Sequence, residues 1–86
     1  MPSVNFTKDA LSDYIDWQNE DKKTLKRINR LLVALSRGDE QMTGKPEALK
    51  YELSGLYSLR IDETNRLVYG IEMDVITVYQ LKGHYD

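Results

Sequence analysis

The sequence predicts one α+β domain: an antiparallel sheet with an N-terminal strand and a two-helix hairpin packed on one face. Two observations predict this fold class. Apolar residues recur every three or four positions in the first half of the chain, which is typical of amphipathic helices, and follow a period of two in the second half, which is typical of strands. A length of 86 residues leaves room for one hydrophobic core, so residues 1–86 are treated as a single domain.

The first half of the chain is predicted to begin with a strand and to continue into the helical hairpin. Residues 3–6 are the strand, and the hydroxyl of Thr7 can cap a helix over residues 8–19. Asp21 is a second capping residue, and Gly38 is suited to end the second helix in a left-handed conformation. Only two or three residues separate the helices, so they should pack as a hairpin. The buried stripe of the second helix is predicted to contain Leu25, Ile28, Leu31, Leu32 and Leu35.

The second half is predicted to be a loop followed by a meander of strands. Residues 39–46 have no period and include Gly44 and Pro46, which indicates a loop, and one irregular helical turn is expected over residues 46–50. The apolar runs that follow are joined by short segments suited to hairpins. The three predicted antiparallel strands cover residues 56–61, 66–73 and 75–82.

Strand alternation assigns the side chains to the two faces of this sheet. Leu59 and Tyr69 fall in apolar sets that should pack against the helices, and the helical register of Trp17 also places it in the core. Arg60 and Arg66 have the opposite parity, so both are expected on the open face. Two arginines there are also compatible with protection of a sheet edge or with solubility, so this pattern alone does not assign a function.

The net charge of −2 hides an uneven distribution along the chain. The first 21 residues carry one lysine against five acids, and the last twenty carry one lysine against three acids. Residues 22–66 carry ten of the twelve Lys and Arg against six acids. A basic middle can face a phosphate backbone, and an ordinary solvated helix face is the alternative explanation.

Several classes of protein are excluded or disfavoured by composition. There is no cysteine, so disulfides and thiolate metal sites are unavailable, and we see no Walker loop, zinc spacing or Ser/His/Asp arrangement. We therefore expect no metal and no other cofactor. The N-terminus does not resemble a signal peptide, and the longest apolar runs are too short to span a bilayer, so a cytoplasmic protein is expected.

The only histidine, His84, stands near the C-terminus and is followed by Tyr85. An imidazole with its ordinary pKa of about 6.5 can both hold and give a proton near neutrality. Chain ends often fray, so a solvated tail is the alternative reading. Glu47 and Lys50 are a second candidate pair, for which the alternative is a simple ion pair across one helical turn.

Short motifs follow one another in a specific order along nearly the whole chain. They are Gly-Lys-Pro-Glu-Ala-Leu-Lys at 44–50, Leu-Ser-Gly at 53–55, Asn-Arg-Leu-Val-Tyr at 65–69 and His-Tyr at 84–85, preceded by Asp-Tyr at 13–14 and Trp-Gln at 17–18. The ordered set strongly resembles the Txe/YoeB toxins of the RelE/ParE superfamily. The resemblance implies a RelE-like fold and the toxin half of a type II toxin-antitoxin pair.

The resemblance also implies an activity, a ribosome-dependent endoribonuclease that cuts messenger RNA in the ribosomal A site. By the same resemblance, Glu47 is the general base, His84 the general acid and Arg66 the ligand of the scissile phosphate. The supporting residues that it implies are Lys50, Arg60 and Tyr85. RNA cleavage without a metal requires one base, one acid and cations for the charge that develops on phosphorus, and this set supplies each of them.

The implied partners are a cognate antitoxin similar to YefM, the ribosome and its messenger RNA. The YoeB relatives are also compatible with a homodimer, and the sequence leaves the oligomeric state open. Two rival functions are a superfamily toxin with another target, such as gyrase, and a non-catalytic interaction module. Gyrase-directed relatives generally lack the catalytic glutamate and the terminal histidine, so Glu47 and His84 favour the nuclease. Asp86 departs from the family pattern by adding a carboxylate beside the expected acid.

Overall fold

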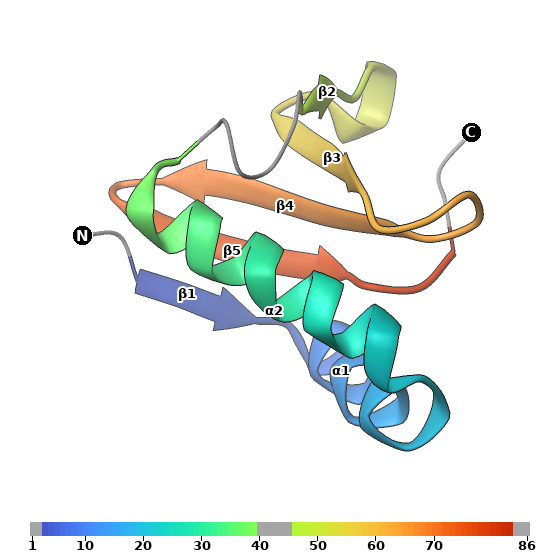
Figure 1. Ribbon diagram of the computed structural model, residues 1–86. Coiled ribbons are helices and arrows are strands. Elements are labelled where there is room, and N and C mark those ends of the chain that lie inside the picture. The colour runs from blue at the N-terminus through green and yellow to red at the C-terminus, as the bar shows by residue number, and fades with distance from the viewer. Residues whose placement is uncertain (1–2, 40–45, 84–86) are drawn as a thin grey trace.

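The computed structural model describes residues 3–39 and 46–83 and confirms the predicted α+β fold class. Across these residues one mixed sheet has the strand order β1-β5-β4-β3-β2, with β1 parallel to β5 and the other pairs antiparallel. Figure 1 shows α2 crossing the sheet and α1 lying below its β1 edge. The elements are β1 (Ser3–Phe6), α1 (Lys8–Glu20), α2 (Lys22–Arg37), β2 (Glu47–Ala48), the 3₁₀ helix η1 (Tyr51–Leu53), β3 (Leu56–Arg60), β4 (Arg66–Glu72) and β5 (Val75–Gln80).

The capping residues expected from the sequence are confirmed. The Thr7 hydroxyl accepts a hydrogen bond from the backbone N–H of Ala10, and the Asp21 carboxylate accepts from those of Lys23 and Thr24. Gly38 ends α2 with a φ of 69°, in the left-handed region. Asp21 alone joins α1 to α2, so the link is shorter than the two or three residues expected.

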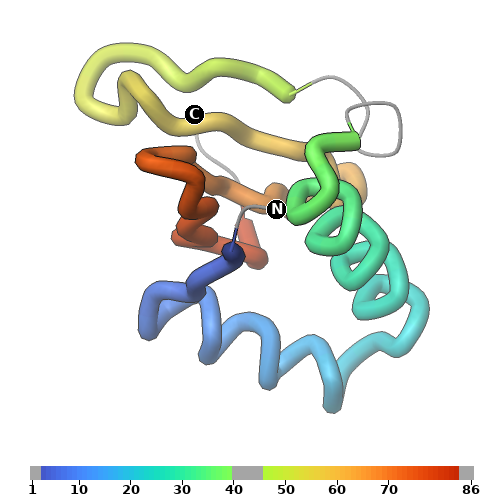
Figure 2. The backbone as a smooth tube through the Cα atoms, turned by 90° about the vertical axis from the view of Figure 1, so that its left-hand side faces the viewer, coloured from blue at the N-terminus to red at the C-terminus, as the bar shows by residue number. Residues whose placement is uncertain are grey.

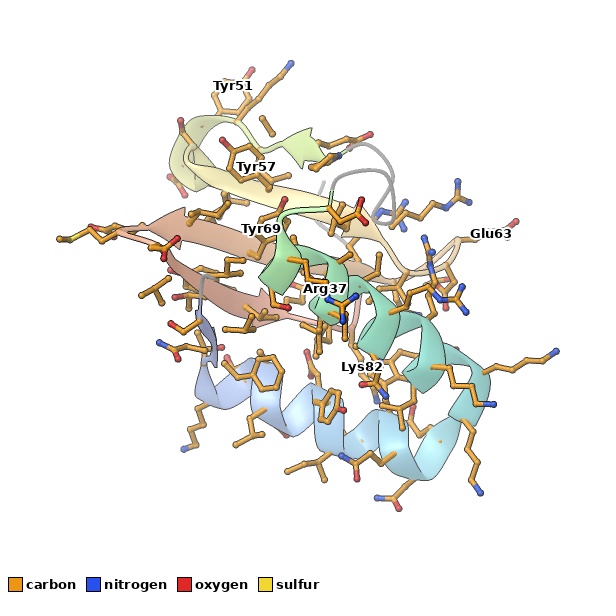
Figure 3. All side chains as sticks on the ribbon, turned by 60° about the vertical axis from the view of Figure 1, so that its left-hand side comes forward. Arg37, Tyr51, Tyr57, Glu63, Tyr69 and Lys82 are labelled. Carbon is orange, nitrogen blue, oxygen red and sulfur yellow. The ribbon has the colours of Figure 1, made fainter. Side chains whose placement is uncertain are left out.

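The core lies between the helices and one face of the sheet (Figure 2). Tyr69 and Trp17 are both buried, as predicted from strand parity and helical register. Tyr57 is opposite Tyr69 on the neighbouring strand, and their rings stack with centroids 5.6 Å apart (Figure 3). The largest fully buried side chains are Ile28, Leu31, Leu59, Leu67, Ile76, Leu81, Val68 and Val78.

Trp17 also connects α1 to the end of the sheet through a hydrogen bond. Its indole Nε1 donates to the backbone carbonyl of Leu81 at 2.9 Å in a buried environment. We expect Trp17→Phe to lower the free energy of unfolding by about 1–3 kcal/mol, because phenylalanine leaves that carbonyl without its donor. Urea unfolding followed by far-UV circular dichroism measures the loss. Tyr51→Phe, at a side chain that is 91% exposed, is the control, and equal stabilities of the two variants would contradict the prediction.

The prediction of a helical turn over residues 46–50 is wrong. Glu47 and Ala48 instead form β2, and the helical turn comes later, in η1. The difference arises because the chain here satisfies its backbone groups on the edge of β3. Glu47 and Ala48 pair with Ser58 and Tyr57, and the N–H of Leu49 donates to the carbonyl of Leu56 at 2.9 Å.

The last strand also departs from regular alternation. Val68 pairs with Gln80 while Tyr69 pairs with Val78, so Tyr79 is an extra residue in a bulge. The bulge reverses the parity of the chain beyond it. Leu81, which strict alternation would place on the face opposite Val78, is consequently buried in the same core.

Candidate active site

The sheet face opposite the helices has a hollow of about 130 Å³ lined by Glu47, Ser58, Arg60 and Arg66. Three neighbouring strands supply these side chains, because Glu47 is opposite Ser58 and Arg60 is opposite Arg66 in the register. The structure therefore brings together three of the residues proposed from the sequence. Ser58, which sequence reasoning did not assign to the site, contributes to the same hollow.

This face is less open than the alternation of the strands suggested. Ser58, Val68 and Gly70 are all buried on it. A β-carbon added at Gly70 would lie 3.1 Å from Cδ2 of Leu56 and 3.5 Å from Cε2 of Tyr79. Side chains of the neighbouring strands, Leu56 and Tyr79, thus cover the part of this face around Gly70.

Arg60 and Arg66 are held close together by a shared acceptor. Nη1 of Arg66 donates to the backbone carbonyl of Asp62 at 2.7 Å and to that of Asn65 at 3.0 Å, and Nε of Arg60 donates to the Asp62 carbonyl at 3.4 Å. Within the part of the chain that the structure describes, neither guanidinium forms an ion pair with a carboxylate. Like charges directly opposite each other on paired strands repel, so an anion bound between these two would relieve the repulsion.

Glu47 and Lys50 do not form the simple ion pair that was the alternative to a functional role. Glu47 is exposed in the extended strand β2, so the two residues are not separated by one turn of helix. No ion pair joins them among the described residues. Lys50 lines an adjoining hollow together with Pro46, Glu47 and Ala48, and it is not among the residues that line the arginine hollow.

His84 and Tyr85, the remaining candidates, lie outside the described residues, as does Asp86. The last described residue is Gly83, whose carbonyl accepts a hydrogen bond from the backbone N–H of Arg66 at 2.8 Å. The peptide bond that leads to His84 therefore starts beside the backbone of Arg66.

The turn between β3 and β4 contains a network that sequence reasoning missed. The Asp62 carboxylate accepts from the backbone N–H groups of Thr64 and Asn65, at 2.8 and 2.7 Å, and from the Asn65 side-chain amide. Burial alone would raise the pKa of Asp62, but the hydrogen bonds from Asn65 and Thr64 outweigh it and lower this pKa. The signal was an Asp followed two and three residues later by Thr and Asn, which is typical of an Asx turn.

The lowered pKa of Asp62 predicts how this turn responds to acid. Because the folded pKa lies below the unfolded value, the carboxylate stabilises the fold above about pH 4 and loses this effect as the pH falls through the folded pKa. We expect Asp62→Asn to be less stable than wild type at pH 7, with a gap that narrows below pH 4. Urea unfolding at a series of pH values measures the gap. A gap that widens towards low pH would contradict this prediction.

The described residues contain neither a metal-binding cluster nor a membrane-spanning helix. No group of three or more His, Cys, Asp or Glu side chains gathers there in a way that could hold a metal ion. No described helix is long and apolar enough to cross a membrane.

Comparison with known proteins identifies relatives along nearly the whole chain. Residues 6–85 match the model of the YoeB-like toxins of bacterial type II toxin-antitoxin systems. Toxin YoeB of Streptomyces coelicolor is 44% identical over 82 residues, which cover 95% of this chain and 98% of that protein. A YoeB dimer from Staphylococcus aureus is 40% identical with a TM-score of 0.84, covering 98% of both chains. The heterotetrameric YoeB-YefM complex from the same species is also 40% identical with a TM-score of 0.84, covering 99% of both chains.

Proposed function

We propose that this chain, which belongs to the YoeB-like toxins of bacterial type II toxin-antitoxin systems, is a metal-independent endoribonuclease that cuts messenger RNA in the ribosomal A site. The observation that carries the proposal is the hollow in which Glu47 lies with Arg60 and Arg66. A carboxylate beside two guanidinium groups combines a proton acceptor with a site for a phosphate.

In the proposed reaction, Glu47 takes the proton of a ribose 2′-hydroxyl, and the resulting oxygen attacks the adjacent phosphorus. The bond from phosphorus to the 5′-oxygen breaks, and His84 gives that oxygen a proton. Arg66 and Arg60 stabilise the negative charge that grows on the phosphoryl oxygens. The products are a 2′,3′-cyclic phosphate and a free 5′-hydroxyl. The cyclic phosphate can open to a 3′-phosphate.

Lys50 and Tyr85 have supporting roles in this proposal. Lys50 lines the hollow next to Glu47, from which its ammonium can draw the RNA backbone towards the reacting phosphate. Tyr85 helps to orient the substrate. Neither side chain takes part in the transfer of a proton.

The experiment that tests the activity uses ribosomes stalled on a defined message, with the Mg²⁺ that ribosomes require retained. We expect cuts in the A-site codon that disappear when ribosomes are omitted and when the nucleotide before the cut carries a 2′-deoxyribose. Primer extension locates the cuts, and enzymatic end analysis identifies the cyclic phosphate. Equal cutting of naked RNA, or cutting of the 2′-deoxy message, would refute the proposal.

Ribosomes stalled on the same message also test whether a metal ion takes part in catalysis. A phosphorothioate at the scissile position weakens any direct Mg²⁺ contact, and Mn²⁺ would restore such a contact because it binds sulfur better. For a reaction driven by Glu47, His84 and the arginines, we expect the rate to be the same in the two metals. Rescue by Mn²⁺ would place a metal in the mechanism.

The proposed partners besides the ribosome are a YefM-like antitoxin and a second copy of the chain, and the proposed location is the cytoplasm, where ribosomes are. The Staphylococcus aureus relatives, solved as a dimer and as a YoeB-YefM heterotetramer, support both partners. We expect an antitoxin segment to cover Arg60, Arg66 and the C-terminus, and thereby to block RNA. A complex in which these residues stay fully exposed would contradict this, and light scattering on the free toxin measures its oligomeric state.

A further inference from the structure

The chain that leads into His84 is held on one side by helix α1. The Leu81 N–H donates to the Asp13 carboxylate at 3.0 Å, and the Leu81 carbonyl accepts from the indole of Trp17 at 2.9 Å. The Lys82 ammonium lies 2.7 Å from the carboxylate of Glu20 and 5.2 Å from the centre of the Trp17 ring. These contacts fix residues 81 and 82 against the body of the protein.

Gly83 is held on the other side by the turn between β3 and β4. Its N–H donates to Oδ1 of Asn65 at 2.8 Å, and its carbonyl accepts from the backbone N–H of Arg66 at 2.8 Å. The N–H and the carbonyl of Gly83 are therefore bound by two consecutive residues, Asn65 at the end of the turn and Arg66 at the start of β4. The φ of Gly83 is +77°, a conformation that glycine adopts without strain.

The orientation of the Asn65 amide is set by Asp62. Nδ2 of Asn65 donates to both oxygens of the Asp62 carboxylate, at 3.0 and 3.1 Å. A carboxylate can only accept here, so it binds the amide nitrogen and turns Oδ1 of Asn65 towards the Gly83 N–H. Asp62 also supplies the backbone carbonyl to which Arg60 and Arg66 both donate. The same turn therefore holds the two arginine side chains and the backbone of Gly83.

We infer that Asn65 is a positioning residue for His84: its side-chain amide, oriented by Asp62, fixes the backbone of Gly83, the residue to which His84 is joined. The inference rests on the proposed function, in which His84 is the general acid. Proton transfer to the leaving oxygen is sensitive to distance, and a displacement of about 1 Å can lower a rate about 100-fold. Asn65 itself touches neither the RNA nor the transferred proton.

Three variants test the role of Asn65 in single-turnover and steady-state cleavage on programmed ribosomes. We expect Asn65→Ala to lower kcat about 10- to 100-fold with KM for the ribosome complex unchanged, because binding is retained and the acid is misplaced. Thr64→Ala, in the same turn and exposed, is the matched control and should cleave like wild type. Asp62→Asn combined with Asn65→Asp exchanges donor and acceptor within the pair, returns an acceptor to the Gly83 N–H, and should recover most of kcat.

A measurement that does not depend on activity examines the same contact. Hydrogen exchange at the Gly83 amide, followed by NMR, should be faster in Asn65→Ala than in wild type and should slow again in the double exchange. The melting temperature of each variant shows whether it is folded.

Two results would overturn the inference while leaving the proposed function intact: cleavage by Asn65→Ala at the wild-type rate, or a loss confined to KM. If the wild-type protein cut no message, the proposed function would be refuted instead. The catalytic reason for the contact between Asn65 and Gly83 would then be lost as well. Failure of the double exchange to restore kcat, when it does restore protection of the Gly83 amide, would also count against the inference.

Discussion

Replacing Glu47 with glutamine is expected to lower the rate of message cleavage about 100- to 10,000-fold, because the amide cannot take the proton of the 2′-hydroxyl. Glutamine has nearly the same shape, and the exposed Glu47 side chain forms no hydrogen bond or ion pair with the described residues, so the fold should be retained. Single-turnover cleavage on programmed ribosomes measures the loss, and thermal unfolding verifies that the variant is folded.

Glu52→Gln is the matched control for this experiment. Glu52 is an exposed acid in η1, close to Glu47 in the sequence and outside the hollow that contains the arginines. We expect it to cleave at the wild-type rate, since it changes the net charge by the same amount without touching the reaction. If the two variants were equally impaired, the effect would come from charge, and Glu47 would not be the base.

Replacing Arg66 with lysine is expected to lower the cleavage rate about 100- to 1,000-fold although the positive charge is retained. The Arg66 guanidinium uses Nη1 for the carbonyls of Asp62 and Asn65, and Nε and Nη2 donate to no other described residue, so in the proposed mechanism they can bind two phosphate oxygens in one plane. A lysine ammonium cannot hold the turn and bind two phosphate oxygens in this way. Single-turnover rates at saturating ribosome concentration measure the effect on the chemical step.

Two controls separate this effect from a loss of charge or of fold. Arg37→Lys makes the same exchange at an exposed residue of the last turn of α2, and we expect it to be without effect. The free energy of unfolding of Arg66→Lys, compared with that of wild type, measures how far loss of the Arg66 contacts to the turn destabilises the fold. A folded Arg66→Lys variant that cuts at the wild-type rate would show that guanidinium geometry is not needed.

Features decided by interactions within a few residues could be predicted from the sequence. Thr7 and Asp21 cap helices through N–H groups two or three positions away, and Gly38 adopts its left-handed conformation for a local steric reason. That Arg60 and Arg66 share one face of the sheet followed from alternation on two neighbouring strands, and the structure adds that they are directly opposite each other. The resemblance supplied the family, which the comparisons confirm, whereas the roles of the site residues, with His84 and Tyr85 among them, stay predictions.

Features decided by partners distant in the chain could not be predicted in this way. The local pattern of residues 46–50 is compatible with either a turn or a strand, and it is the free edge of β3 that selects the strand containing Glu47. The parallel pairing of β1 with β5 and the bulge at Tyr79 likewise depend on how the sheet is assembled.

What the sequence by itself determined is which chemical groups are available and which of them share a strand face. Only the tertiary structure decided that Glu47 lines the same hollow as Arg60 and Arg66, and that Asn65 binds the backbone of Gly83 from 18 positions away. The physical reason is range: caps and strand parity are set by neighbours in the chain, whereas a site is assembled by hydrogen bonds and burial between segments whose separation no local pattern encodes.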